Sequence, residues 1–356
     1  MRCAARPEPR SFLRYRGTNI WQERRATFIR PQIAVLTTGG TIAARPTRSG
    51  EVVVAASSEE LLASVPEAKR VAGVHVVELF RIDSSLMTPQ NMLAIAREIR
   101  ELDEEGLSGF VVTHGTDTME ESAYLVDLLH AGEKPVVFTG AQRNAADRDA
   151  DGPRNLVDAI RVAASPATRG VGAVVAMAGR IDAARDATKI HTSALAAFSS
   201  PDHGKLGEVE DETVRVFRFR ARPDNLCRTD SVEPRVALVK MAAGMDGTFL
   251  RAARETGAAG IVLEAFGLGN ANHEVLAEVE RSVNSGVPVV VVSRVPSGSV
   301  APVYGDGGGH DLREAGAISG GNLSGQKARV LLMVALAAEK EIGEPLEGLL
   351  APHLEI

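Results

Sequence analysis

The sequence has little of what several protein classes require. Only two of its 356 residues are cysteines, Cys3 and Cys227, which excludes a disulfide framework and a cysteine-based zinc site. The eight histidines contain no HxxxH pair, so we expect no metal centre. The formal net charge is −6, which argues against a nucleic-acid partner, and no apolar run is long enough to cross a membrane.

What is present is typical of a globular enzyme. Hydrophobic residues make up 44% of the chain and charged residues 24%. The length exceeds that of one ordinary core and predicts two domains. Residues 1–30 differ, with eight arginines, two glutamates and no lysine or aspartate, a local charge of +6. These residues contain no apolar stretch of the kind found in signal peptides, so we interpret them as a disordered arm or an over-extended translation start. The remaining chain is predicted to be cytoplasmic.

Short β-branched runs alternate with amphipathic stretches from Ile33 onward. This order predicts an α/β fold of two domains, each with a mainly parallel sheet flanked by helices. In the first domain the expected strands are 33–36, 74–79, 109–113, 135–139 and 172–177, and the expected helices 58–64, 89–102, 119–131 and 152–164. Thr88 is the expected N-cap of the second helix, with Pro89 at its first position.

The texture changes after Ser200. Residues 214–219 alternate apolar side chains with arginine, as an antiparallel edge strand does. Residues 220–233 are polar and aperiodic and are interpreted as a linker, so the domains are expected at 31–219 and 234–356. The second domain is expected to contain strands 235–240, 260–263 and 288–293 and helices 247–256, 272–284 and 324–340.

Two threonine-and-glycine turns follow expected strands. The first is Thr37-Thr38-Gly39-Gly40-Thr41, in which the glycines let the backbone approach a ligand closely. The Thr41 hydroxyl then lies beside N–H groups suited to an anion or a developing oxyanion. The alternative is a tight turn without chemistry; a dinucleotide site is disfavoured because the full GxGxxG pattern is missing.

The second turn, His114-Gly115-Thr116-Asp117, adds another hydroxyl and a carboxylate. A threonine needs a base to become a nucleophile, and a lysine serves if its surroundings keep it partly neutral. Lys189 is the candidate, although an isolated lysine is usually a solvated surface residue. Two nucleophile-type residues on two such loops favour covalent acyl chemistry.

These motifs, in this order, resemble the bacterial-type asparaginase/glutaminase family of amidohydrolases. The resemblance covers about residues 32–340 and rests on ordered segments of the sequence: 38–43 (TGGTIA), 83–88 (DSSLMT), 113–120 (THGTDTME), 140–143 (GAQR), 150–156, 185–189 (RDATK), 267–272 (GLGNAN), 293–298 and 326–332 (QKARVLL).

The resemblance implies a role for each matching position. Thr41 is implied as the nucleophile that attacks the side-chain amide, and Thr116, Asp117 and Lys189 as a second polar triad that assists proton transfer. N–H groups near Gly40 and Thr116 would stabilise the oxyanion. Substrate-binding positions, with Asn272 coming from a neighbouring subunit, would be Ser84, Ser85, Thr116, Asp117, Ala141 and Asn272. The implied reaction is hydrolysis of L-asparagine to L-aspartate and ammonia by a homo-oligomer, a dimer or tetramer, without cofactor or metal.

The sequence departs from the family pattern at two places. The loop after Thr41 (residues 44–53) lacks the tyrosine that family enzymes carry there. Tyr304 from a partner subunit is a candidate replacement, and the simpler alternative is that Tyr304 is an ordinary surface residue. The stretch 304–313 has no glutamate, and Ser85 replaces a longer glutamine. Three alternatives therefore stay open: hydrolysis of glutamine or another small amide, an ammonia-supplying subunit, and a non-catalytic amino-acid-binding protein.

Overall fold

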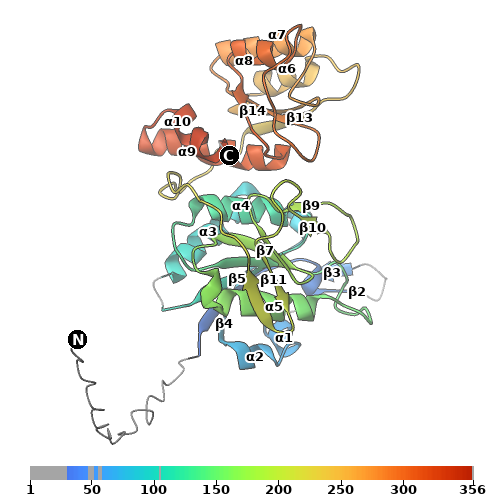
Figure 1. Cartoon of the computed structure of the whole chain (residues 1–356), viewed down its shortest axis with the longest axis vertical. Helices are drawn as coiled ribbons and strands as arrows, with labels where there is room; N and C mark the ends of the chain where they lie inside the picture. Colours follow the sequence, from blue (N-terminus) through green and yellow to red (C-terminus); the bar gives the residue numbers. More distant parts are fainter. Residues whose placement is uncertain (1–29, 47–51, 55–57, 104–105, 355–356) are drawn as a thin grey trace, which may run out of the picture. The chain divides into compact units, whose positions relative to one another are not determined.

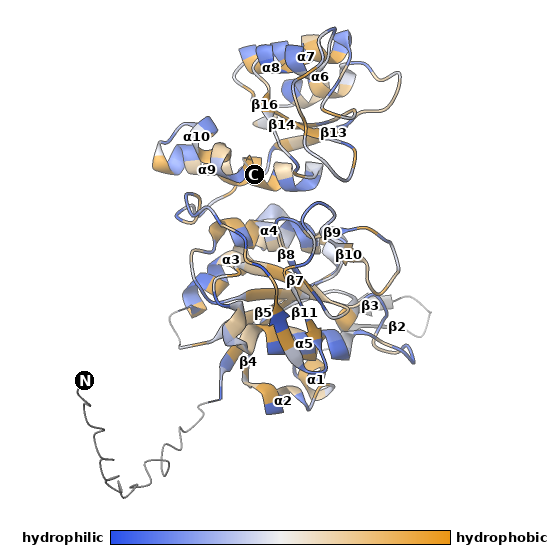
Figure 2. Cartoon of the chain, viewed as in Figure 1, coloured by the Kyte–Doolittle hydropathy of each residue, from blue (hydrophilic) through white to orange (hydrophobic). Residues whose placement is uncertain are grey.

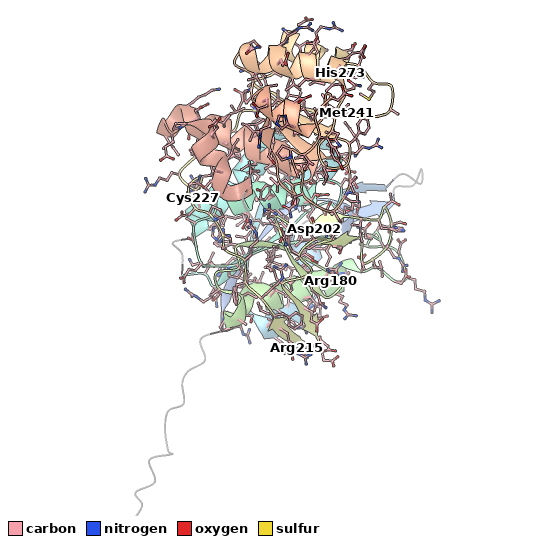
Figure 3. The ribbon with its side chains drawn as sticks, turned by 45° about the horizontal axis from the view of Figure 1, so that its top comes forward. Arg180, Asp202, Arg215, Cys227, Met241 and His273 are labelled. Carbon is pink, nitrogen blue, oxygen red and sulfur yellow. The ribbon has the colours of Figure 1, made fainter. Side chains whose placement is uncertain are left out.

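The alternation of strands and helices predicted from the sequence is present in the computed structural model, which describes residues 30–46, 52–54, 58–103 and 106–354 (Figure 1). Residues Pro31–Ile356 form one unit. The predicted arm, apart from Arg30, and the predicted absence of a Cys3–Cys227 bridge concern residues outside those described. Cys227 has a free, half-buried thiol (Figure 3).

The first sheet contains eight strands in the described residues, in the order β12-β11-β8-β7-β6-β5-β1-β4. The run from β7 to β4 is parallel, whereas β8, β11 and β12 are antiparallel to their neighbours. The bounds are β1 (Gln32–Gly39), β4 (Gly73–Ile82), β5 (Gly109–Thr113), β6 (Val136–Thr139), β7 (Ala173–Met177), β8 (Arg180–Ala183), β11 (Gly207–Glu210) and β12 (Thr213–Val216).

Both faces of this sheet are covered by helices, which is why its central strands are apolar throughout. Alternate residues of β1 enter different cores: Ile33 and Val35 one, Ala34 and Leu36 the other. Figure 1 shows α1, α2 and α5 on one side and α3 and α4 on the other. These helices are α1 (Ser58–Ala63), α2 (Ala68–Val71), α3 (Pro89–Leu102), α4 (Met119–Leu129) and α5 (Gly152–Ala164).

The second sheet is parallel, with the order β13-β14-β15-β16. Strand β13 appears as an apolar segment in Figure 2. One face packs against α6, α7 and α8 in a third core. The bounds are β13 (Val236–Lys240), α6 (Thr248–Glu255), β14 (Gly260–Ala265), α7 (His273–Asn284), β15 (Val289–Ser293), α8 (Gly309–Glu314) and β16 (Ile318–Ser319).

Helix α9 (Gly325–Ile342) joins the two halves. Its buried residues lie all around the helix, including Val330, Met333 and Ala337, as expected for a helix enclosed by protein. It packs on α4 of the first half and on β13, β14 and β15 of the second, so one hydrophobic core runs through both. Helix α10 (Leu346–Leu354) packs against it. No helix within the described residues is long and apolar enough to cross a membrane.

Several elements had no signal in the sequence. They are short and depend on distant partners: β8 and β11, the hairpins β2 (Ala44–Pro46) with β3 (Val52–Val54) and β9 (Thr188–Lys189) with β10 (Phe198–Ser199), the short helices η1 (Thr41–Ala43), η2 (Ser84–Leu86) and η3 (Pro166–Thr168), and α2, α8, β16 and α10. The predicted edge strand 214–219 ends at Val216. The segment 220–233 carries ion pairs: Arg222 with Asp127 at 2.9 Å and Asp230 with Arg97 at 3.0 Å.

Candidate active site

Strand β1 ends in two glycines at a tight turn. Gly39 has φ +107° and Gly40 φ +82°, a region that favours glycine. A Cβ on Gly39 would lie within 3.0 Å of the Ile82 backbone, and one on Gly40 within 3.0 Å of the Gly115 backbone. The turn therefore brings Thr41, the first residue of η1, beside the second threonine loop.

Three loops meet at this edge because β4, β1 and β5 are adjacent parallel strands whose carboxyl ends coincide. A Cβ on Gly115 would lie within 3.0 Å of the Ser84 side chain and 3.2 Å from the Gly40 Cα. The buried Ser84 hydroxyl accepts a hydrogen bond from the Asp117 N–H at 3.3 Å, and its carbonyl accepts one from the Thr118 hydroxyl at 2.8 Å.

Lys189 reaches this edge from β9. Its Nζ donates to Thr116 Oγ1 at 2.9 Å and to Asp117 Oδ1 at 2.8 Å. The Lys189 side chain is 17% exposed and that of Asp117 61%, while Thr116 is buried. The lysine amine therefore lies between a buried hydroxyl and a solvated carboxylate, an arrangement suited to passing a proton between a hydroxyl and water.

A cavity of about 840 Å³, open to solvent, lies over the ion pair and is lined by Asp117, Lys189, Ile190, His191 and Thr192. Thr41 is half-buried, and among the described residues its hydroxyl has no hydrogen-bond partner. The N–H of Gly40 already donates to the Ile82 carbonyl at 3.2 Å, so this group is not itself free for an oxyanion.

Ala141 is buried directly after β6, and the loop that carries it is tied down by a carboxylate. Asp151 accepts from the N–H groups of Gln142 and Arg143 at 3.0–3.1 Å. Asn155 donates to the Gly140 carbonyl and to Asp151, both at 3.0 Å. These contacts fix the backbone around Ala141.

Two residues of the predicted site, Ser85 and Asn272, make their hydrogen bonds to residues outside the triad of Thr116, Asp117 and Lys189. Ser85 is exposed, and its N–H donates to Asp83 at 3.4 Å. Asn272 is the N-cap of α7, where its side chain accepts from the Val275 N–H at 2.9 Å and donates to the Met245 carbonyl at 2.8 Å. Within one described chain, the hydrogen bonds of Asn272 stay in the second half. Tyr304 is 56% exposed, also in that half.

His114 supports the second loop from beneath. It is fully buried, with Nδ1 2.7 Å from the Gly115 carbonyl and Nε2 2.8 Å from the Ser122 hydroxyl. Burial lowers its pKa to about 4, and the bond to Gly115 offsets that effect only in part. The imidazole is therefore neutral at pH 7, and it holds the loop rather than carrying charge.

The described residues contain no group of three or more histidine, cysteine, aspartate or glutamate side chains able to hold a metal ion.

Comparison with known families gives two matches that follow the two halves. The model "Asparaginase, N-terminal" matches residues 32–222, and "Glutaminase/Asparaginase C-terminal domain" matches residues 235–345. The chain belongs to the asparaginase family of amidohydrolases. A Bacillus licheniformis protein named L-asparaginase is 37% identical over 87% of this chain and 97% of its own length.

Two further members of the asparaginase family bear on where such proteins act. A Haemophilus influenzae protein named probable periplasmic L-asparaginase is 38% identical over 87% of this chain and 90% of its own length. A solved structure described as a probable cytoplasmic L-asparaginase from Campylobacter jejuni superposes with a TM-score of 0.81, is 34% identical, and covers 92% of this chain and all of its own.

Sequence reasoning missed the residues that hold the asparaginase-family site in place. His114, Glu120, Asp151 and Gln326 all stood within the motifs that carried the resemblance, but no role was attached to them. Glu120 Oε1 accepts from the Lys189 N–H at 3.2 Å, and Oε2 accepts from Gln326 at 3.2 Å. No local pattern sets these residues apart, since His114 lies between Thr113 and Gly115 and Gln326 lies between Gly325 and Lys327.

Proposed function

We propose that this protein hydrolyses L-asparagine to L-aspartate and ammonia through an acyl-threonine intermediate. The observation that carries the proposal is the position of Lys189 Nζ, within hydrogen-bond distance of both Thr116 and Asp117 beside the glycine turn of Thr41. A hydroxyl without a hydrogen-bond partner, a second hydroxyl and an amine on one sheet edge are the parts that acyl transfer needs.

In the first half-reaction Thr41 Oγ1 bonds to the side-chain amide carbon, and the carbonyl electrons move onto its oxygen. Collapse breaks the C–N bond, and the nitrogen leaves as ammonia with the threonine proton. In the second half-reaction water attacks the ester, its proton passes through the Lys189–Thr116–Asp117 group, and Thr41 recovers its hydroxyl as aspartate leaves. Backbone N–H groups near Thr41 and Thr116 would stabilise the oxyanion.

Substrate recognition is assigned to polar groups around the three loops. Ser84 and Asp117 would hold the α-carboxylate and α-amino groups of the substrate, and the backbone of Ala141 would contact the leaving amide. Ser85 would border the same pocket. Asn272 would complete it from a neighbouring subunit, which is consistent with its hydrogen bonds lying in the second half of its own chain.

The test is ammonia release from L-asparagine by wild type and by the variants Thr41→Ala and Thr116→Ala. Hydroxylamine added during turnover should capture the intermediate as the aspartyl hydroxamate. The proposal requires Thr41→Ala to lose both turnover and hydroxamate while still binding L-aspartate in a thermal-shift titration. Hydroxamate formation by Thr41→Ala would move the nucleophile elsewhere.

Glutamine hydrolysis is the second candidate, favoured by the openness of the cavity over Lys189 and by the short, exposed Ser85. One methylene changes binding in a pocket by about 1–3 kcal/mol, so both amides should be assayed in parallel. Binding of aspartate without turnover of either amide would favour the non-catalytic reading instead.

We propose a homo-oligomer, a dimer or tetramer, located in the cytoplasm, with domains at 31–219 and 234–356 and a linker at 220–233. Exposed apolar side chains in the second half support association, among them Val303 at 62% and Tyr304 at 56% exposure. Light scattering on the purified protein measures the state directly. A monomer that is fully active would remove the proposed role of Asn272.

A further inference from the structure

The segment that leads to Lys189 is held by a buried cation from the other half of the chain. Lys327, on α9, is 2% exposed and donates from Nζ to the carbonyls of Ala184 and Ala187, the latter at 2.5 Å. The same Nζ lies 5.7 Å from the centroid of the Tyr124 ring. The two carbonyls accept hydrogen bonds from the ammonium, and the ring adds a cation–π contact.

Gln326, the residue before Lys327, acts on the Lys189 end of the same segment through Glu120. Gln326 Nε2 donates to Glu120 Oε2 at 3.2 Å, and Glu120 Oε1 accepts from the backbone N–H of Lys189 at 3.2 Å. Glu120 is 5% exposed and lies on α4, one turn after Asp117. Two adjacent residues of α9 therefore hold residues 184–189 in place. Lys327 bonds to the carbonyls of the segment directly, and Gln326 acts on Lys189 through Glu120.

Within this segment Ala184 and Ala187 pack in the hydrophobic core, whereas Arg185, Asp186, Thr188 and Lys189 are polar. A small cavity with a mainly polar lining adjoins it, and its lining includes Asp186, Thr188 and Lys327. Arg185 is fixed by another contact from the second half, donating to Asn322 at 2.8 Å. Hydrogen bonds with Asn322 and Lys327 therefore act together with the core packing of the two alanines to hold the segment before Lys189.

We infer that Glu120, Gln326 and Lys327 are positioning residues that set the location of Lys189 relative to Thr116 and Asp117. The inference rests on the proposed function, because it assumes that Lys189 moves a proton there. Lys189 Nζ must satisfy two bonds of 2.9 and 2.8 Å at once. A displacement of about 1 Å is enough to cost on the order of 100-fold in rate.

A purely structural role would favour a different residue at position 327. Burial lowers the pKa of Lys327 to about 8, with Glu120 and Asp186 opposing that effect, so enclosing this amine is unfavourable. An apolar side chain would fill the same volume without that penalty. The ammonium is what binds the two carbonyls of the segment.

The variants Lys327→Met, Gln326→Leu and Glu120→Met test the inference. Each should lower kcat at least 10-fold while KM and the Kd for L-aspartate change less than 3-fold, because the Ser84 hydroxyl, which is assigned to the substrate, bonds to the Asp117 N–H and not to the segment. Glu120→Gln keeps an acceptor for the Lys189 N–H, and the Gln326 amide can flip to match it. It should therefore recover at least a third of the wild-type kcat.

Two variants on α9 serve as matched controls. Arg329→Met removes bonds from the Arg329 side chain to the carbonyls of Val236 and Pro234, which belong to the second half. Leu332→Ala opens the buried face near Gly260 and destabilises without touching residues 184–189. If Leu332→Ala lowers kcat as much as Lys327→Met at an equal drop in Tm, the inference is wrong and the effect is one of stability.

A second readout does not need turnover. The rate at which acetic anhydride acylates Lys189, followed by peptide mass spectrometry, should rise at least 3-fold in Lys327→Met and Gln326→Leu as the bonds to Thr116 and Asp117 loosen. Unchanged acylation in both variants overturns the inference. A wild type without amidase activity would overturn the proposed function alone, and this labelling would still decide whether α9 positions Lys189.

Discussion

At the scale of single residues, the site depends on places where a side chain is missing. Gly40 and Gly115 let the backbones of two loops touch, and the Ser84 side chain fills the space beside them. The glycines could be predicted from the sequence as turn residues. Their contact could not, because 75 positions, including the helices α1 to α3 and the strands β2 to β5, separate Gly40 from Gly115 along the chain.

Gly40→Ala should both destabilise the protein and inactivate it. The matched control is Gly257→Ala, since Gly257 has a similar φ, +84° against +82°, but nothing within 4 Å of its Cβ position. The left-handed backbone costs about 1–2 kcal/mol in either variant. Gly40→Ala must in addition push the Gly115 backbone away, so we expect at least twice that loss in urea unfolding and a fall in kcat/KM of about 100-fold. Equal losses in the two variants would contradict the contact.

Acid should destabilise the protein through its buried histidines. Burial lowers the pKa of His114 to about 4 and that of His353 to about 4, from an ordinary value of 6.5. The unfolded chain then binds more protons than the folded one between pH 6.5 and 4, so stability is complete above 6.5 and falls toward pH 4. For the fully buried His114 the loss is roughly 3 kcal/mol. Urea unfolding at pH 7, 6, 5 and 4 measures it, and His353→Gln should flatten part of the slope. Equal stability at pH 7 and 4.5 would contradict the buried neutral imidazoles.

At the scale of elements, those with local signals in the sequence were predicted, and those that form only through distant contacts were not. The N-cap of α3 was predicted correctly: the Thr88 hydroxyl accepts from the Asn91 N–H at 3.2 Å, and α3 runs over the predicted residues 89–102. The two-residue strand β9 was not readable, because it exists only through pairing with β10. Lys189 lies on β9, so the element that carries the proposed base had no sequence signal.

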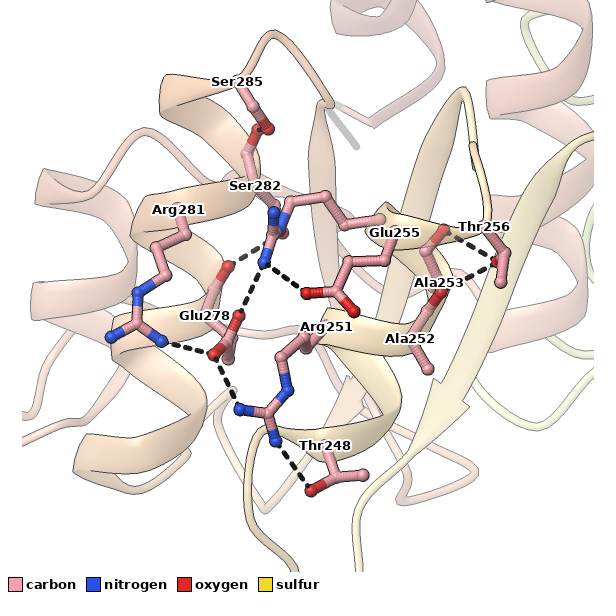
Figure 4. A network of polar contacts seen from close by, with 11 residues as sticks. Thr248, Arg251, Ala252, Ala253, Glu255, Thr256, Glu278, Arg281, Ser282 and Ser285 are labelled. Atoms are coloured by element: carbon pink, nitrogen blue, oxygen red, sulfur yellow. Dashed lines mark hydrogen bonds and ion pairs between the residues drawn. The ribbon is translucent and has the colours of Figure 1, made fainter.

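Helices α6 and α7 are joined by a buried carboxylate (Figure 4). Glu278 is 3% exposed and pairs with Arg251 at 3.9 Å, with Arg254 at 3.4 Å and with Arg281. Glu278→Gln should cost about 1–2 kcal/mol, because the arginines are partly solvated and the amide still accepts one bond. Glu255→Gln, on an exposed carboxylate 3.7 Å from Arg254, should cost less than about 0.5 kcal/mol. Thermal unfolding of both variants gives the comparison, and equal Tm values would remove any structural role for Glu278.

At the scale of the whole molecule, the two halves share one core. The cluster that contains Leu36, Phe110 and Tyr124 of the first half continues through Leu331 and Val334 of α9 to Val262 and Val290 of the second sheet. Tyr124 is 1% exposed and lies inside this core. Helix α9 thus covers one face of the second sheet and packs on α4, which covers the first sheet, so the two predicted domains share this helix.

A chain of residues 31–222 should therefore fail to fold cooperatively, although it contains the whole first sheet and Thr41, Thr116, Asp117 and Lys189. Without α9 the apolar face of α4 is exposed, and residues 184–189 lose Gln326 and Lys327. We expect strong binding of a hydrophobic dye, loss of near-UV circular dichroism and no sharp thermal transition. Residues 31–356 are the control. A sharp transition of the short chain would show that its core closes without α9.

The sequence by itself determined the α/β class, the places of the long helices and of the central strands, and the set of polar residues at strand ends. Those features follow from hydrophobic period, capping residues and glycine, all of which act within a few positions of the chain. Only the tertiary structure decided that Ser84, Thr116, Asp117 and Lys189 are linked by hydrogen bonds. The same holds for the bonds between α9 and the segment before Lys189. Such contacts join residues 33 to 206 positions apart, and a hydrogen bond selects its partner by geometry that exists only once both cores have closed.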